Sequence, residues 1–327
     1  MPYTIAVADS VFPNLDPARE VVAQVGAQLQ VASEPTPDAI MRVARDADAI
    51  LVTYARITAD MIRQLTQCRI ISRFGIGVDN VDIPEATKAG IVVTKVPDYC
   101  IDEVSDHTMA LLLSLVRKIP FVNAQVHSGT WRMLSVVPIH RLRGTVLGLV
   151  GFGRIPQLVA PKAKAFGMNV VTFDPFVPRE VFTGAGVEGV DFATLLKISD
   201  YVSIHSPLVP ETRNLFNAEA FRQMKPTAYL VNTARGPIVD EAALAEALDA
   251  GHIAGAALDV MVQEPPADGS PLFGRDNVII TPHTSFYSEE SLVELQTKAA
   301  QEVVAVLKGQ APRNPVNPEA LQVQSAK

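Results

Sequence analysis

A glycine-rich segment near the middle of the chain has residue types and spacing suited to binding a dinucleotide. Gly151-Phe152-Gly153-Arg154-Ile155-Pro156 follows an apolar run and precedes a helix-like stretch, and Asp174 closes a second apolar run. Glycines there let backbone N–H groups approach a pyrophosphate at a helix N-terminus, and the acid accepts from ribose hydroxyls. The glycines alone would also fit an ordinary strand-to-helix turn. The strand, helix and acid around them favour the cofactor interpretation.

The acid also bears on which dinucleotide would bind. A 2′-phosphate would place negative charge beside Asp174, and Pro175–Pro178 contains no basic partner for it. Arg179 is the nearest basic residue, five positions after Asp174. The pattern therefore favours NAD over NADP as the cofactor.

Two prolines depart from this pattern. Pro156 stands where a third glycine is usual, in the first helical turn, where an N–H has no intrahelical partner. Pro161 would fall inside the helix, where a proline costs about 3 kcal/mol and bends the axis. We therefore predict a kinked or displaced helix near residues 156–161.

Further polar segments follow other apolar runs, where an open α/β sheet binds its ligands. These segments are Ser203–Leu208, Asn232–Gly236, Leu258–Pro265 and Thr281–Thr284. Together with Arg73–Asp82, they closely resemble the D-isomer-specific 2-hydroxyacid dehydrogenase family, over nearly the whole chain. Within that family, Val96–Cys100 and Tyr287–Ser291 most resemble the C-terminal-binding-protein-like branch and its bacterial relatives.

Arg235, Glu264 and His283 are the candidate catalytic residues. An imidazole titrates near working pH, so His283 suits proton transfer to a developing alkoxide. Glu264 would favour the imidazolium and orient the ring. Arg235 offers a planar fork of donors that grips a carboxylate and polarises a carbonyl. The matching residues of the family carry these roles. Taken singly, the three also fit a turn-binding arginine, a helix cap and a loop histidine.

The resemblance also implies which residues meet the cofactor and the substrate. Asp259 would orient the nicotinamide carboxamide. Phe286 replaces a tryptophan of the corepressor branch, so we expect a differently shaped side-chain pocket. Arg56, which also fits a solvated loop position, and the Gly75-Ile76-Gly77 backbone would meet the substrate carboxylate. The other cofactor-binding residues would be Gly151, Gly153, Arg154, Ile155, Asp174, Thr108, His205, Pro207, Thr212, Thr233 and Ala234.

Apolar runs alternate with helical stretches along most of the chain, which predicts parallel sheets covered by helices. The N-terminal series predicts strands at Ile5–Ala8, Ala49–Val52, Arg69–Ser72 and Ile91–Val93, and helices at Pro17–Gln28, Asp38–Arg45 and Ala59–Leu65. A second series, from Thr145 to Pro282, has about six strands, as a full doubly wound dinucleotide fold does. A final amphipathic helix, Ser288–Leu307, is expected to return to the first domain.

We therefore expect an α/β protein in which a Rossmann-type doubly wound parallel sheet is inserted into a smaller flavodoxin-like α/β domain. Residues 1–100 and 288–327 would form the substrate-binding domain. Residues 101–287 would form the dinucleotide-binding domain. The two segments that cross between them would act as a hinge.

The composition narrows the class of protein and its partners. The net charge is −7, with 48% hydrophobic and 19% charged residues, so no basic surface predicts nucleic acid or anionic lipid. Cys68 and Cys100 are widely spaced, which is typical of reduced thiols in a cytoplasmic protein rather than a metal site.

The family assembles as dimers through the hinge-helix region, and the apolar Met109–Val116 would suit a homodimer interface. Trp131 is expected to be a buried anchor or a dimer contact.

Three functions remain open at this stage. The first is interconversion of a D-2-hydroxy acid and its 2-oxo acid with NAD. The second is an NAD(H)-responsive corepressor-like protein with little turnover. The third is a phosphite or phosphoglycerate dehydrogenase. Formate is disfavoured, because formate dehydrogenases have Gln where this chain has Glu264.

Overall fold

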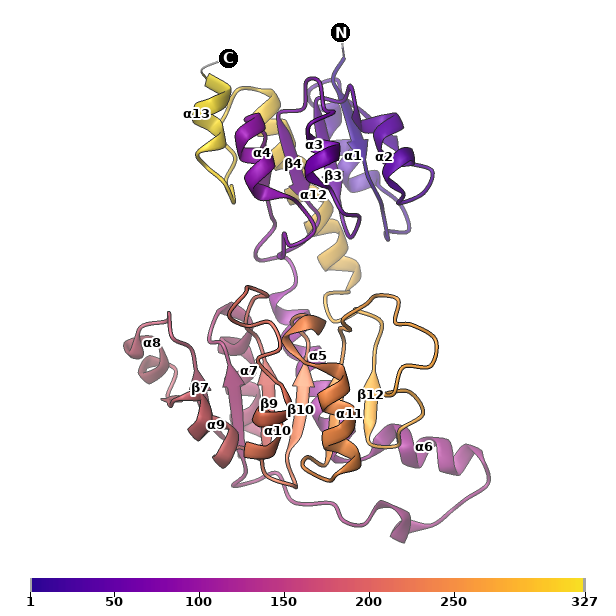
Figure 1. Ribbon diagram of the computed structural model, residues 1–327, viewed down its shortest axis with the longest axis vertical. Coiled ribbons are helices and arrows are strands. Elements are labelled where there is room, and N and C mark those ends of the chain that lie inside the picture. Colours follow the sequence, from indigo (N-terminus) through magenta and orange to yellow (C-terminus); the bar gives the residue numbers. More distant parts are fainter. Residues whose placement is uncertain (1, 326–327) are drawn as a thin grey trace. The chain divides into compact units, whose positions relative to one another are not determined.

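The computed structural model describes residues 2–325 and divides into two compact units. The first consists of Met1–Tyr99 and Ser288–Lys327, and the second of Cys100–Tyr287. The predicted boundary at residue 100 differs from this division by one residue. In Figure 1 the first unit combines the indigo N-terminal segments with the yellow C-terminal ones.

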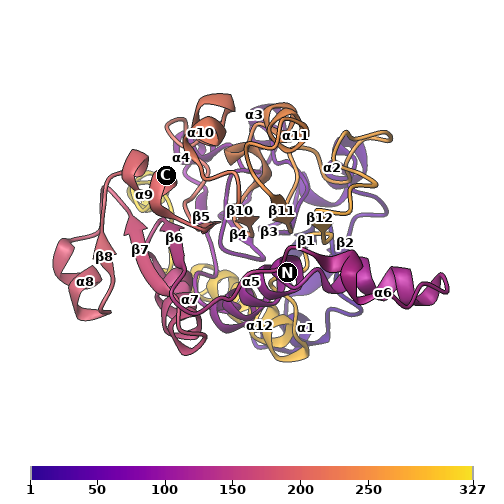
Figure 2. The ribbon, with the colours of Figure 1, turned by 90° about the horizontal axis from the view of Figure 1, so that it is seen from below.

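The first unit is built on a parallel five-stranded sheet of order β2-β1-β3-β4-β5, a flavodoxin-like order. Its strands are β1 Thr4–Val7, β2 Gln28–Val31, β3 Ala49–Val52, β4 Ile70–Arg73 and β5 Val92–Thr94. Its helices are α1 Asp16–Ala23, α2 Pro37–Ala44, α3 Ala59–Ile62, α4 Ile83–Ala89, α12 Glu289–Leu307 and α13 Ala320–Ser325. Helices α1 and α12 pack together on one face, and α2, α3 and α4 cover the other (Figures 1 and 2).

Strand β2 was not predicted, and the predicted helix Pro17–Gln28 is too long. Helix α1 ends at Ala23, and Gly26 reverses the chain with a φ of 66°, in the region that favours glycine. The following Gln28–Val31 forms an edge strand that is largely exposed. An edge strand with two polar residues in four has no apolar run, so the hydrophobic pattern did not reveal it.

The second unit is a parallel seven-stranded sheet of order β12-β11-β10-β9-β6-β7-β8, which makes it a Rossmann-type doubly wound fold. Its strands are β6 Val146–Val150, β7 Asn169–Phe173, β8 Glu188–Gly189, β9 Tyr201–Ile204, β10 Tyr229–Asn232, β11 Gly255–Leu258 and β12 Val278–Ile280. The two-residue edge strand β8 was not predicted. Its helices are α5 Ile101–Val116, α6 Ile119–His127, α7 Arg154–Ala165, α8 Arg179–Gly184, α9 Phe192–Ile198, α10 Ala218–Gln223 and α11 Glu241–Asp249, with 3₁₀ turns η1 Met133–Val136 and η2 Gly236–Ile238.

Apolar layers on both faces of this sheet hold the second unit together. Helices α5 and α7 cover one face, and α9, α10 and α11 cover the other (Figure 2). Met109, Leu112 and Leu115 of α5 are 1–5% exposed, because the helix packs on α7 and on the sheet. The apolar stretch Met109–Val116 is therefore core and not the exposed dimer surface that we expected.

Helix α7 continues through both prolines. It runs from Arg154 to Ala165 with Pro161 inside it, and Pro156 lies buried in its first turns. Gln157 N–H donates to Gly153 O at 3.3 Å, so the helix closes its first turn across Pro156. The helix is therefore unbroken at both prolines, and the kink or displacement of its axis near residues 156–161 stays a prediction.

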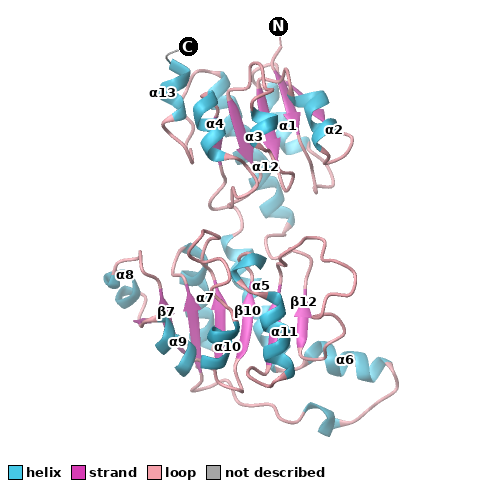
Figure 3. Cartoon of the chain, in the orientation of Figure 1, coloured by secondary structure: helices cyan, strands magenta, loops and turns pink. Residues whose placement is uncertain are grey.

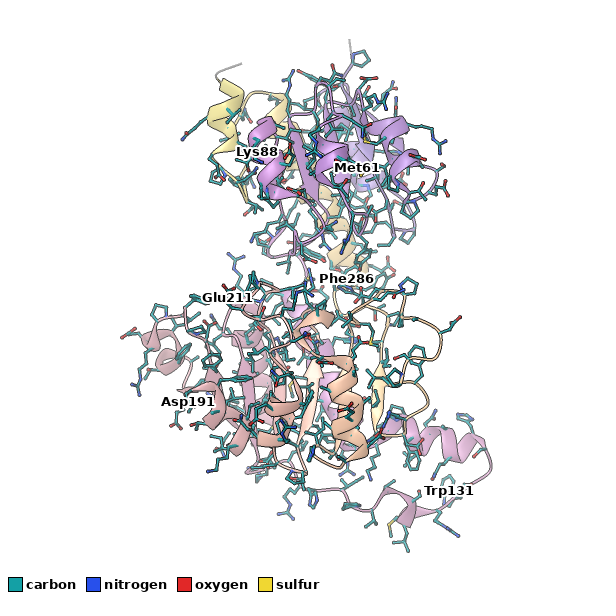
Figure 4. All side chains as sticks on the ribbon, viewed as in Figure 1. Met61, Lys88, Trp131, Asp191, Glu211 and Phe286 are labelled. Atoms are coloured by element: carbon teal, nitrogen blue, oxygen red, sulfur yellow. The ribbon has the colours of Figure 1, made fainter. Side chains whose placement is uncertain are left out.

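An exposed arm leads from α5 to β6. It consists of α6, the 3₁₀ turn η1 and the loops around them, and it extends from the rest of the second unit (Figure 3). Trp131 is 89% exposed and Met133 75% exposed, and Figure 4 shows Trp131 on this arm. Trp131 is therefore not a buried anchor within the chain, whereas its role as a dimer contact stays a prediction.

The described residues contain no single helix that is long and apolar enough to cross a membrane. Within residues 2–325, the pair α5 and α6, bent by 59° at the break between them, is the one that meets that criterion together, by length and composition.

Candidate active site

The glycine-rich loop joins β6 to α7 at the carboxyl edge of the second sheet. Gly151 has a φ of 94°, and a Cβ there would lie 3.0 Å from the His205 carbonyl and the Ser206 nitrogen. Gly153 is the N-cap of α7, and no atom lies within 4 Å of the position its Cβ would take. The first residue must therefore be glycine for conformation and contact, and the second leaves open space at a helix N-terminus.

Asp174, directly after β7, holds this loop. Its Oδ2 accepts from Phe152 N–H at 2.8 Å, and its Oδ1 accepts from the Phe176 and Val177 N–H groups at 2.9 and 3.1 Å. A carboxylate has about four acceptor positions, so a half-buried Asp174 can still accept from a hydroxyl.

The residues at this edge fit a dinucleotide. Ser206 Oγ is buried and has no hydrogen-bond partner among residues 2–325, and the Ser206 backbone nitrogen lies 3.0 Å from the position that a Cβ on Gly151 would take. The strands β7, β6, β9 and β10 are consecutive in the sheet, so the loops that follow them meet at one edge. Those loops and the first turn of α7 carry most of the predicted cofactor residues, namely Arg154, Ile155, His205, Pro207, Thr212, Thr233 and Ala234.

Two predicted cofactor residues do not reach the surface. Thr108 is 1% exposed, donates to Val104 O at 2.7 Å and lies 3.0 Å from the Thr233 hydroxyl. The Asp259 side chain is 0% exposed, because its oxygens bind groups inside the unit. The structure thus holds both side chains inside the second unit, and the cofactor-lining role of Thr108 and the carboxamide role of Asp259 stay predictions.

His205 is a neutral histidine. Desolvation lowers the pKa of His205 from 6.5 to about 3. Its Nε2 lies 2.9 Å from Ser203 Oγ. At physiological pH it therefore carries no charge and places its backbone against Gly151.

The pKa of His205 gives the first testable prediction. The unfolded chain protonates this imidazole near pH 6.5 and the folded chain only near 3, so unfolding takes up a proton between these values. The free energy of unfolding should fall with falling pH in that window, by about 1.4 kcal/mol per pH unit from this site. Urea unfolding of His205→Gln should show a shallower pH dependence than the parent. Equal slopes, with the exposed His252→Gln as control, would contradict the assignment.

Arg235 lies in a tight turn after β10. Asn232, 0% exposed, donates from Nδ2 to Arg235 O and accepts from Ala234 N–H, both at 3.0 Å. One guanidinium nitrogen of Arg235 donates to Ala234 O at 2.8 Å. A Cβ on Gly236 would lie 2.0 Å from the Met261 carbonyl, so glycine is required for this turn to touch the loop after β11.

Glu264 and His283 form a hydrogen-bonded pair. Glu264 Oε2 lies 2.7 Å from His283 Nδ1, and Glu264 Oε1 accepts from Met261 N–H at 2.9 Å. Partial burial raises the pKa of Glu264. The hydrogen bond and charge of His283, the Met261 N–H and the charge of Arg235 outweigh this effect, so the net result is a lowered pKa of Glu264. Glu264 is therefore ionised at neutral pH and fixes the His283 ring through Nδ1.

The backbone and the ring of His283 are both constrained by their surroundings. His283 has a φ of 52°, which is uncommon for a residue other than glycine. Its ring lies edge-to-face with Phe286, with centroids 6.2 Å apart. The second unit thus brings Arg235, Glu264, His283 and Phe286 to the same edge as the glycine-rich loop.

The predicted substrate residues of the first unit lie at the carboxyl ends of its adjacent strands β3 and β4. Arg56 is exposed, and its loop runs beside the next one, with Ile57 N–H donating to Asn80 O at 2.9 Å. Gly75 has a φ of 147°. Arg56 and Gly75-Ile76-Gly77 are therefore neighbours within this unit.

Arg73 supports the Gly75 loop, and it was predicted only as the first residue of the Arg73–Asp82 segment, without a role of its own. A Cβ on Gly75 would lie 1.1 Å from Arg73 Nη1, so the guanidinium fills the space that glycine leaves. Arg73 is 7% exposed, and its guanidinium carbon lies 5.9 Å from the Tyr54 ring centroid. The only hint in the sequence was its place directly before the glycine loop.

No group of three or more His, Cys, Asp or Glu residues suited to a metal ion occurs among residues 2–325.

Comparison with known proteins identifies the family of the chain and agrees with its fold. The sequence profile of the D-isomer specific 2-hydroxyacid dehydrogenase NAD binding domain matches residues 109–285. A D-3-phosphoglycerate dehydrogenase of Methanocaldococcus jannaschii is 40% identical over 307 residues, which cover 93% of this chain and 58% of that protein. A glyoxylate reductase of Thermofilum pendens is 40% identical over 295 residues, 89% of this chain and 87% of the relative. The chain belongs to the D-isomer specific 2-hydroxyacid dehydrogenase family, and its second unit contains the NAD-binding domain.

A solved structure supports the fold over both units. D-lactate dehydrogenase from Aquifex aeolicus, complexed with NAD and lactic acid, superposes with a TM-score of 0.84 at 28% identity and covers 98% of each chain. The chain spans little more than half the length of the phosphoglycerate dehydrogenase it matches. These relatives support the family and not specifically the corepressor branch that we expected.

Proposed function

We propose that the protein is an NAD-dependent oxidoreductase that interconverts a D-2-hydroxy acid and its 2-oxo acid. The observation that carries this proposal is the 2.7 Å pair of Glu264 and His283 beside Arg235, in the unit that holds the dinucleotide loop. A proton donor, an anion-binding cation and a hydride carrier are the three things that this reaction needs.

The proton is moved by His283. Its Nδ1 is engaged by the ionised Glu264, so Nε2 is the nitrogen that faces the substrate oxygen. In reduction, Nε2–H gives its proton to the oxygen that develops on C2 of the 2-oxo acid; in oxidation, Nε2 takes the hydroxyl proton. A dinucleotide held at the glycine-rich loop would supply the hydride to C2 in reduction and accept it in oxidation. Glu264 stabilises the imidazolium and keeps the ring oriented.

Arg235 binds the substrate and polarises its carbonyl. Its guanidinium offers donors to the carbonyl and carboxylate oxygens, where charge develops during reduction. Arg56 and the backbone of Gly75-Ile76-Gly77 would bind the substrate carboxylate from the first unit. Phe286, against the His283 ring, would contact the substituent on C2.

NAD is the preferred cofactor in this proposal. The Asp174 carboxylate is positioned by the Phe152 N–H of the glycine-rich loop and by the Phe176 and Val177 N–H groups of its own turn, and it would face the adenosine ribose. A 2′-phosphate there would meet this negative charge, so NADPH should bind less tightly than NADH.

A substrate screen tests the function. NADH oxidation should be observed with at least one of glyoxylate, hydroxypyruvate, pyruvate and phosphohydroxypyruvate. The glyoxylate reductase and phosphoglycerate dehydrogenases among the relatives make the first and last of these the leading candidates. An assay of NAD⁺ reduction by phosphite tests the phosphite alternative. NADH binding without turnover on any compound would overturn the proposal and favour the corepressor-like alternative.

The exposed arm between α5 and β6 favours a homodimer as the working form. Trp131, Met133, Leu134 and Val137 are 62–89% exposed on it, a concentration of apolar side chains that a second copy of the chain would cover. Localisation remains the expectation from the cysteine content.

A further inference from the structure

The loop that carries His283 is held by one buried carboxylate. Asp259 Oδ1 accepts from the Thr281 hydroxyl at 2.6 Å and from Thr284 N–H at 2.9 Å, and its Oδ2 accepts from Ser285 N–H at 2.9 Å. The Asp259 side chain is 0% exposed. A buried charge persists when hydrogen bonds satisfy it, so these three donors and the carboxylate stabilise one another.

A histidine from another element completes this network. His107, on α5, places Nε2 at 3.2 Å from Thr281 Oγ and 3.6 Å from Asp259 Oδ1. The Thr281 hydroxyl has one proton, and the 2.6 Å contact assigns it to the carboxylate. The hydroxyl oxygen must then accept at its contact with His107. His107 therefore carries a proton on Nε2, and this N–H donates a hydrogen bond to the Thr281 hydroxyl oxygen.

The network acts on a residue with an unfavourable backbone conformation. His283 has a φ of 52°, and its N–H donates to Asp259 O at 2.8 Å and to Thr281 O at 3.0 Å. A residue other than glycine keeps such a conformation only where its surroundings over-determine it. The two carbonyls belong to Asp259 and Thr281, which are residues of the network. The hydrogen bonds to the Asp259 carboxylate therefore also fix the positions of the carbonyl oxygens that accept from the His283 N–H.

We propose that His107 is a positioning residue for His283. It holds the Thr281 hydroxyl against Asp259, and Asp259 holds the loop on both sides of His283. The proposal rests on the proposed function, in which His283 is the proton donor. His107 lies 174 positions from Thr281, so no sequence motif joins the two.

Two amide variants separate positioning from packing. The Gln amide nitrogen of His107→Gln takes the place of Nε2 and can still donate to Thr281, whereas His107→Asn places its amide nearer the backbone, at the depth of Nδ1. His107→Leu removes the donor altogether. We expect kcat for 2-oxo acid reduction to fall about tenfold in the Leu and Asn variants and to stay within about threefold in the Gln variant, because small misplacements of a catalytic group are costly. The Kd for NADH should be unchanged.

A second measurement reads the loop without reference to activity. Hydrogen exchange of the 281–287 peptide should be faster in the Leu and Asn variants than in the parent and the Gln variant, because the Thr284 and Ser285 amides lose protection. In a Thr281→Val background, His107→Leu should have no further effect on kcat or on exchange.

The outcomes are distinguishable. Unchanged exchange in the Leu variant would overturn the network, whatever the activity. Faster exchange with unchanged kcat would overturn the positioning role, because His107 would then stabilise the loop without affecting catalysis. An equal loss in the Gln and Asn variants would also count against it, because packing alone would then explain the effect. If the parent enzyme reduces no 2-oxo acid, the proposed function fails, and the exchange comparison alone decides whether His107 holds the loop.

Discussion

Replacing His283 by Ala is expected to lower kcat for 2-oxo acid reduction by about 10³- to 10⁴-fold, in the upper range for a general acid. Glu264 orients the His283 imidazole through their hydrogen bond. It cannot take over the proton transfer when His283 is removed, because it is ionised at neutral pH and has no proton to give. NADH binding should change little, because the glycine-rich loop and Asp174 lie on other strands.

Stopped-flow reduction together with NADH fluorescence titration would measure both quantities. The matched control is His252→Ala, which removes an exposed histidine outside the site and should leave kcat unchanged. Near-normal turnover of His283→Ala would remove the central residue from the proposed mechanism. A large rise in the NADH Kd would show that the loss arises from a damaged cofactor site.

The parts of the site that the sequence predicted are those encoded locally. Gly151 and Gly153 join a strand to a helix because the surrounding apolar run and helical stretch are continuous in sequence. Glu264 and His283 are 19 positions apart, yet their loops follow β11 and β12, which are neighbours in the sheet. Knowing that parallel strands end at one edge was enough to expect them together.

The parts that the sequence did not predict depend on partners far away in the chain. Packing buries Asp259, and burial of a single residue has no sequence signature. The apolar face of α5 around Leu112 was expected to be exposed, whereas α7 and the sheet cover it. The same pattern of residues suits a core and an interface, so only the packed structure distinguishes them.

Replacing Arg235 by Lys is expected to lower kcat/KM for the 2-oxo acid by about 10²-fold, within the range for loss of a donor to a developing oxyanion. Lys keeps the positive charge but offers a point charge in place of a planar fork. One nitrogen of the guanidinium is already used on Ala234 O, which fixes the direction of the fork. An ammonium has no equivalent rigid attachment and would leave the substrate less well oriented.

The kinetic pattern distinguishes this mechanism from a general loss of structure. Steady-state assays should show both a lower kcat and a higher KM, because Arg235 would bind the ground state and polarise the carbonyl in the transition state. Arg222→Lys is the matched control: Arg222 also binds a carboxylate with two nitrogens, that of Glu219, but on the exposed surface of α10, and its replacement should leave activity unchanged. If Arg235→Lys raised KM alone, Arg235 would bind the substrate without polarising it, and the electrophilic part of the mechanism would have to come from His283.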